Sequence, residues 1–132
     1  MSLTPLTETQ VAIRDTARDF AAAELAPHVS QWDRDAHFEP SLVGKLGELG
    51  FLGMLLPEQY DGLGLDALSY LLALEEIAMV DASTAVLMSV HNSLPTQMLL
   101  RFGSETQRTR FLAPMARGDL LVLMGGDARP WL

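Results

Sequence analysis

A stiff corner between two apolar stretches is the feature that most restricts how this chain can fold. Its residues 55–66 read Leu-Leu-Pro-Glu-Gln-Tyr-Asp-Gly-Leu-Gly-Leu-Asp. Pro57 disfavours the helical conformation at the residue before it, whereas Gly62 and Gly64 can adopt positive φ. The chain can therefore reverse sharply before Asp66 caps a following helix. We expect Gly62 or Gly64, or both, to have positive φ and this corner to connect two helices.

Two capping boxes mark helix starts near opposite ends of the chain. Thr7-Glu-Thr-Gln10 and Ser104-Glu-Thr-Gln107 each place a hydroxyl three residues before a side-chain amide, so that side chains can satisfy the free backbone amides of a first turn. Apolar residues at helical spacing follow the first box, namely Ile13, Ala17 and Phe20. Pro27 is expected to end that helix.

The stretch between Pro27 and the corner is predicted to contain one short helix. Residues 30–38 are mostly polar and are interpreted as a connector. Pro40 suits a first helical position, and apolar residues follow it up to Gly50, at Leu42, Val43, Leu46 and Leu49. Residues 51–56 are apolar but too few to classify by period, and we favour a buried, extended entry to the corner over a strand.

Beyond the corner, the spacing of apolar residues predicts helices only. Residues 67–80 carry apolar side chains around most of a helix, which predicts a central element buried on most sides. A further helix is expected from Ser83 to Gly103, in which Pro95 either introduces a kink or opens a new turn. With the helix that the second capping box begins, the sequence predicts an all-α fold, a compact antiparallel bundle of five or six helices.

Composition excludes several classes of function. The 132 residues are enough for one domain, the formal net charge is -8, and only nine residues are Lys or Arg, which argues against nucleic acid as a partner. The absence of cysteine excludes thiolate chemistry. No apolar run of about 18 residues could span a membrane, and no targeting segment opens the sequence, so we expect a soluble, cytoplasmic protein.

Groups of reactive side chains are few, and each has a structural explanation that we favour. Asp33, Asp35 and His37 could bind a metal, but a solvated loop is favoured because no fourth ligand accompanies them. Of Glu75 and Glu76 at most one is expected to be buried, since neighbours on a helix point about 100° apart, and a partnered or rim carboxylate is favoured over a catalytic one.

Two further motifs are also interpreted as structural. His91-Asn-Ser93 lacks a cysteine partner or a nucleophile elbow, so a polar patch that interrupts a helix is favoured over a reactive site. Gly62-Leu-Gly64 lacks the third glycine of a dinucleotide-binding loop. We therefore expect no catalytic, cofactor-binding or metal-binding residue in this chain, and assign Pro57, Gly62 and Gly64 to a structural corner.

Six motifs in one order connect the sequence with a known family. They are Leu6-Thr-Glu-Thr-Gln10, Ala26-Pro27 with Trp32-Asp-Arg-Asp35, Leu46-Gly-Glu-Leu-Gly-Phe-Leu-Gly53, the corner from Pro57 to Asp66 followed by Glu75-Glu76, His91-Asn-Ser-Leu94, and Phe102-Gly-Ser-Glu-Thr-Gln107. Together they resemble the amino-terminal helical domain of acyl-CoA dehydrogenases, with a leaning to the short-chain type. The resemblance assigns residues 1–118 to that domain and leaves 119–132 as a divergent tail where a middle β-domain would begin.

The resemblance implies a function for the longer protein and a smaller part in it for this domain. Family members oxidise acyl-CoA to 2-enoyl-CoA with FAD and pass electrons to an electron-transfer flavoprotein, and the middle and carboxy-terminal domains supply the flavin site and the catalytic base. The helical domain lends one wall of the acyl pocket, which here corresponds to Val86, Leu87, Val90 and Leu94, called the acyl wall below. We accordingly expect the isolated chain to be inactive and to bind no FAD.

Two hypotheses of different classes follow from the sequence. In the first, the chain is the amino-terminal part of such an enzyme, shortened by a frameshift, a split gene or a cloning boundary. In the second, it is a stand-alone helical module that acts through protein contacts or binds a lipid-like ligand. The apolar segment Leu120-Leu-Val-Leu-Met124 needs cover in either case, so we expect the isolated chain to self-associate.

Overall fold

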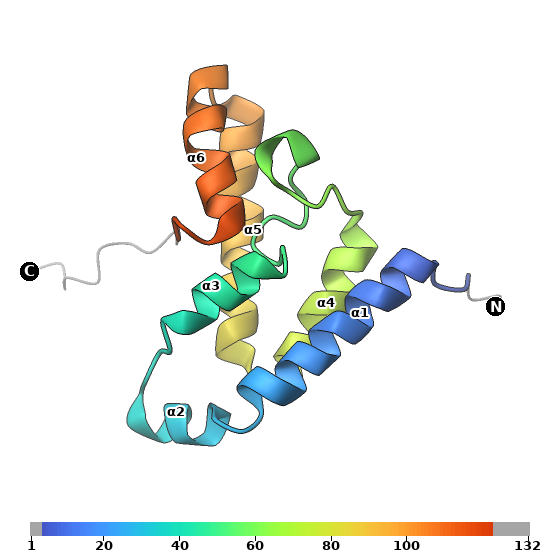
Figure 1. The fold of residues 1–132 in the computed structure, drawn as a ribbon, viewed down its shortest axis with the longest axis vertical. Helices are drawn as coiled ribbons and strands as arrows, with labels where there is room; N and C mark the ends of the chain where they lie inside the picture. The colour runs from blue at the N-terminus through green and yellow to red at the C-terminus, as the bar shows by residue number, and fades with distance from the viewer. Residues whose placement is uncertain (1–3, 123–132) are drawn as a thin grey trace, which may run out of the picture.

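Six α-helices, joined by turns, make up residues 4–122, which are the residues that the computed structural model describes (Figure 1). No strand occurs in this part of the chain, so the predicted all-α fold is confirmed. None of these helices combines the length and hydropathy that crossing a bilayer requires. The helices are α1 (Glu8–Phe20), α2 (Val29–Asp35), α3 (Ser41–Glu48), α4 (Ala67–Ala78), α5 (Ala82–Phe102) and α6 (Glu105–Arg117), with a π-turn at Ala21–Leu25 and a 3-10 turn at Glu58–Tyr60.

Both capping boxes begin helices as predicted. The Thr7 hydroxyl accepts the Gln10 amide at 3.2 Å, and the Gln10 side chain accepts the Thr7 amide at 3.0 Å. Ser104 and Gln107 repeat these two bonds at the start of α6. The first helix ends through the π-turn before Pro27, since the Ala26 amide reaches back to the Ala21 carbonyl. Local sequence is sufficient here because each pair of partners lies within one helical turn.

Helices α1 and α4 lie side by side and form the broadest contact of the bundle (Figure 1). Arg18 of α1 reaches across with two bonds to the Glu76 carboxylate, at 2.8 Å from Nη2 to Oε1 and 3.2 Å from Nε to Oε2. Glu76 is buried and Glu75 is exposed. The prediction that at most one of these two acids is buried, and partnered, is confirmed.

The corner is held by backbone bonds to the apolar segment before it. Three backbone amides of the corner donate to carbonyls of that segment. The Leu63 amide donates to the Gly53 carbonyl at 2.9 Å. The Gly64 amide donates to the Leu56 carbonyl at 2.8 Å and the Leu65 amide to the Met54 carbonyl at 2.9 Å. Gly64 has positive φ, at 59°, which confirms the prediction for that residue. Gly62 does not, but a Cβ there would lie 2.1 Å from the Leu56 carbonyl oxygen, so it is glycine because of close approach. Asp61 adopts positive φ instead, at 61°.

Two predictions about the segments before the corner are wrong. Residues 51–56 are buried but not extended, because they form consecutive turns in which the Gly53 amide donates to the Gly50 carbonyl and the Leu56 amide to the Gly53 carbonyl. The expected polar connector at 30–38 contains α2. None of the residues of α2 is buried. The sequence therefore has no apolar stripe at helical spacing from which this helix could have been predicted.

The prediction that the helix after the corner is buried on most sides is also wrong. Ala73 and Ile77 of α4 are fully buried, yet Leu68 and Leu71 are 46% and 54% exposed. The reason is that α4 packs between α1 and α5 and has no described neighbour over its outer face. Helix α5 begins at Ala82 behind an Asp81 cap and continues through Pro95 without opening a new turn. The apolar tail segment at 120–124 is described only as far as Val122, and the rest lies outside the described residues.

Three alanine substitutions test the account of the corner. Gly62→Ala should lower the free energy of unfolding by about 2 kcal/mol or more, because backbone must move away from the new Cβ. Gly64→Ala should cost about 1 kcal/mol through its positive φ. Gly44 of α3 is the matched control: a Cβ there meets nothing within 4 Å, so alanine should be neutral or stabilising. Urea unfolding measures all three, and a Gly62 variant as stable as the Gly44 variant would contradict the close approach.

Candidate functional site

The middle of α5 carries a buried amide that binds three backbone groups. Asn92 Nδ2 donates to the Phe51 carbonyl at 2.7 Å and to the Met88 carbonyl at 2.9 Å. Its Oδ1 accepts the Met54 amide at 3.1 Å. Both ends of the side-chain amide are thus occupied, and residues 51–54 are attached to α5 through it. Asn92 is a structural residue with no hydrogen-bonding capacity aimed at a ligand.

His91 makes the equivalent connection on the neighbouring side of α5. The Val122 amide donates to Nδ1 at 3.4 Å, so the ring proton is on Nε2, which lies 3.0 Å from the Met115 carbonyl and donates to it. The ring is fully buried, and burial lowers the pKa of His91. Ser93 is exposed and donates to the Ser89 carbonyl. Helix α5 is continuous through all three residues, so the expected interruption of the helix is wrong. Their interpretation as structural residues agrees with these bonds.

The outer face of α5 is apolar and open. Val86 is 60% and Leu94 is 49% exposed, whereas Leu87 and Val90 are half-buried and Leu87 packs partly on the main core. At 100° per residue the four side chains lie within an arc of about 100°. The structure thus brings the predicted acyl wall together on one face. Met98 and Phe102 continue the stripe at four-residue spacing and are also exposed, which the sequence analysis did not predict.

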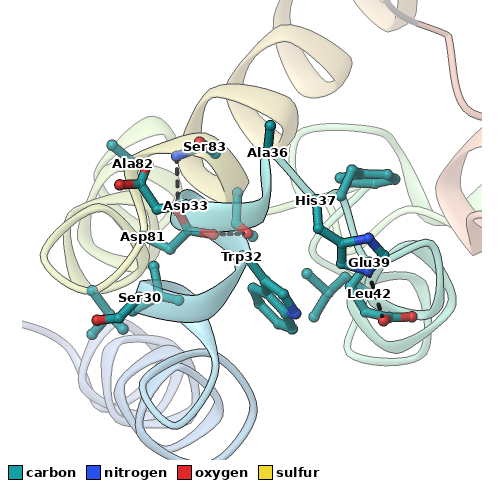
Figure 2. A pocket seen from close by; sticks show the side chains of 14 residues that line it. Ser30, Trp32, Asp33, Ala36, His37, Glu39, Leu42, Asp81, Ala82 and Ser83 are labelled. Carbon is teal, nitrogen blue, oxygen red and sulfur yellow. Dashed lines mark hydrogen bonds and ion pairs between the residues drawn. The ribbon is translucent and has the colours of Figure 1, made fainter.

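A separate open pocket of about 640 Å³ lies between α2 and the junction of α4 with α5 (Figure 2). Figure 2 shows the Trp32 ring between Asp81 on one side and the His37–Glu39 pair on the other. No residue of the acyl wall lines this pocket. Its lining consists of Val29, Ser30, Trp32, Asp33, Ala36, His37, Phe38, Glu39, Leu42 and residues 80–84.

Two of the three acids that line this pocket, Glu39 and Asp81, have partners in the protein. Asp81 caps α5 by accepting the Ser83 amide and the Thr84 hydroxyl. Hydrogen bonds from Ser41, and then the contact with His37, lower the pKa of Glu39 and keep it ionised at neutral pH. Asp35, which was considered as a metal ligand and lies outside the pocket lining, accepts a bond from Gln31. Within residues 4–122 no group of three acids or histidines is placed to hold a metal ion.

Comparison with known proteins decides what this bundle is. The family model described as acyl-CoA dehydrogenase, N-terminal domain, matches residues 7–119. The chain belongs to the acyl-CoA dehydrogenase family. The mitochondrial short-chain specific acyl-CoA dehydrogenase of Mus musculus is 48% identical over 114 residues, a match that covers 86% of this chain and 28% of the mouse protein. This chain therefore spans less than a third of the length of such relatives.

Solved structures of the same family share the fold. Butyryl-CoA dehydrogenase from Megasphaera elsdenii matches with a TM-score of 0.83 and 36% identity, over 92% of this chain and 32% of that one. A glutaryl-CoA dehydrogenase from Mycobacterium smegmatis in complex with FADH2 matches with a TM-score of 0.84 and 34% identity, over 88% of this chain and 30% of that one. Those matches agree with an amino-terminal helical domain.

Neither the pocket of Figure 2 nor the acyl wall fits the flavin of an acyl-CoA dehydrogenase. The pocket of Figure 2 is lined by Asp33, Glu39 and Asp81 and by no lysine or arginine. An anionic diphosphate needs cationic or backbone donors, and three carboxylates would repel it. The acyl wall is apolar and offers no hydrogen bonds to a flavin ring. No step of the family's chemistry can be assigned to these residues.

Substituting Asn92 tests whether the polar motif of α5 holds the domain together. Asn92→Leu should lower the free energy of unfolding by about 3 kcal/mol, because the Met54 amide and the Phe51 carbonyl would remain buried without partners. Ser93→Ala, the neighbouring control, should change it by no more than about 0.5 kcal/mol, since Ser93 is exposed. Chemical unfolding followed by circular dichroism measures both. Equal effects of the two substitutions would disprove the structural assignment.

Proposed function

We propose that this chain is the amino-terminal helical domain of a flavin-dependent acyl-CoA dehydrogenase that oxidises acyl-CoA to 2-enoyl-CoA. Family membership supports the domain assignment, with residues 1–118 as the domain and 119–132 as the start of a different segment. The observation that carries the function is the open apolar face of α5, where Val86 and Leu94 are about half exposed. Helices of globular proteins ordinarily turn such an apolar stripe toward the core and not toward water. An acyl chain, in turn, binds best against an apolar wall that excludes water.

The substrate class that this wall suits is a short acyl thioester. The names of the similar proteins from mouse and Megasphaera elsdenii specify short-chain and butyryl-CoA substrates. All four residues of the wall, Val86, Leu87, Val90 and Leu94, are aliphatic, so they contribute shape and no hydrogen bonds. Selection by such a surface is modest, about 1 to 3 kcal/mol for each methylene accepted or refused.

FAD and an electron-transfer flavoprotein would complete the proposed reaction. The Mycobacterium smegmatis relative is in complex with FADH2, in a chain of which this one matches 30%. When bound, the flavin would accept the hydride of the oxidation. The contribution of this chain is to exclude water from the acyl group and to orient it through α5.

The isolated chain should therefore be colourless. After purification, incubation with FAD and gel filtration, it should show no absorbance in the flavin bands, because neither the pocket of Figure 2 nor the acyl wall suits the cofactor. The full-length Megasphaera elsdenii enzyme, treated identically, is the control. Flavin that remains with the isolated chain through gel filtration would contradict this prediction.

A chimera tests the proposed function directly. Residues 4–118 would replace the matching domain of butyryl-CoA dehydrogenase from Megasphaera elsdenii, with which the fold agrees at a TM-score of 0.83. The chimera should retain FAD and oxidise butyryl-CoA with an artificial electron acceptor. A chimera that folds and holds FAD but leaves butyryl-CoA unchanged would favour the alternative, a helical module that has lost the chemistry.

The same chimera tests the acyl wall. Leu94→Trp should narrow the slot and raise KM about tenfold more for hexanoyl-CoA than for butyryl-CoA, which corresponds to about 1.4 kcal/mol of selectivity. Met79→Trp is the control, because Met79 is exposed at the end of α4 and outside the wall. Steady-state kinetics with both substrates provide the comparison. The assignment of Leu94 fails if both substitutions change the two KM values alike.

A further inference from the structure

The chain makes a tight turn where it leaves α6. Gly118 ends the helix with φ of 81°, and its amide donates to the Met115 carbonyl at 3.2 Å. The next two amides, Asp119 and Leu120, both donate to the Pro114 carbonyl. These bonds lie within one turn of the helix end and need no other part of the protein.

The next contact of this exit segment, residues 119–122, comes from a different helix. The Val122 amide donates to Nδ1 of His91, which lies 31 residues earlier on α5. Nε2 of the same ring donates to the Met115 carbonyl at 3.0 Å. One imidazole thus connects α5 to the last turn of α6 and to the segment that follows it. Because the ring is fully buried, water is not available to replace either bond.

We propose that His91 is a positioning residue that fastens the exit segment to α5 while its ring is neutral and releases the segment when the ring is protonated. The neutral ring has one donor and one acceptor, and the two backbone partners require that arrangement. A protonated ring has two donors, so its Nδ1 proton would face the Val122 amide proton. The bond to Met115 survives protonation, whereas the bond to Val122 does not.

The charged groups around the helix end do not compensate a charge on His91. Arg117 of α6 pairs with Asp61 of the corner at 2.6 Å and with Asp119 of the exit segment at 2.9 Å. Among the described residues, the Met115 carbonyl favours the protonated ring, but burial has the larger effect and lowers the pKa of His91. The folded pKa is thus below the unfolded value of about 6.5. The neutral ring stabilises the fold above that value, and this contribution is lost as pH falls below it toward the folded pKa.

The position of His91 connects this fastening with the acyl wall. Leu87 and Leu94 lie four residues before and three residues after it, so the three side chains share one side of α5. Through His91 the exit segment is attached to the side of α5 that carries Leu87 and Leu94. The connection with the acyl wall depends on the function proposed above, whereas the fastening is a property of the present chain.

Amide exchange of the complete 132-residue chain, labelled with 15N, tests the proposal. At about pH 7.5 the ring nitrogens should show the Nε2–H tautomer, and Val122 should be protected. On lowering the pH to about 5, the protection factor of Val122, corrected for intrinsic exchange, should fall at least about tenfold. Leu120 is the internal control, because its bond to the Pro114 carbonyl does not involve His91.

Two substitutions separate fastening from general stability. His91→Gln can still donate to the Met115 carbonyl and accept from the Val122 amide, but it does not titrate, so Val122 should remain protected at both pH values. His91→Leu should leave Val122 unprotected at both while Leu120 stays protected. The Nδ1–H tautomer in the unmodified chain, full protection of Val122 in His91→Leu, or the same pH-dependent loss in His91→Gln would each overturn the proposal. If His91→Leu does not fold, the tautomer and the glutamine variant still decide it.

Discussion

The structure depends on the three hydrogen bonds of one buried amide, that of Asn92. Residues 51–56 are buried without regular secondary structure, and their backbone groups must find partners away from water. Asn92 supplies partners for Phe51 and Met54, and amides of the corner supply others. The turns then present carbonyls that bind the corner, and the corner directs the chain into α4. Loss of this one side chain would remove support from the turns and the corner together.

Helix α5 carries polar and apolar side chains in an unusual distribution. Its buried residues include the apolar Ala85 and Met88 and the polar His91 and Asn92, which fasten the turns and the end of α6. Its outer side carries the acyl wall, of which Val86 and Leu94 are largely exposed. Globular helices ordinarily place polar residues outward and apolar residues inward. The exposed acyl wall departs from that rule, as the function proposed above requires, and the buried polar side chains of His91 and Asn92 are paired with backbone groups.

The candidate site could be predicted only in part. The resemblance selected Val86, Leu87, Val90 and Leu94, and the structure places them on one face, but their contact with an acyl group stays a prediction. The stripe's extension to Met98 and Phe102 could have been found from the four-residue spacing alone. The fastening by His91 could not, because its partners are backbone groups of Met115 and Val122, and a sequence does not indicate which carbonyl or amide will come near a given ring.

What the sequence by itself determined are features whose partners are close along the chain. The capping boxes at Thr7 and Ser104 and the Asp66 cap needed no more than one turn of helix to form. The tertiary structure alone decided the turns at residues 51–56, because Asn92 lies 38 and 41 residues from its partners there. The tertiary structure also explains the glycine at position 62. A Cβ there would collide with the Leu56 carbonyl, which folding brings close, whereas the backbone torsion angles of Gly62 do not require glycine. Short-range bonds follow from residue type and spacing, whereas close packing depends on where distant segments meet.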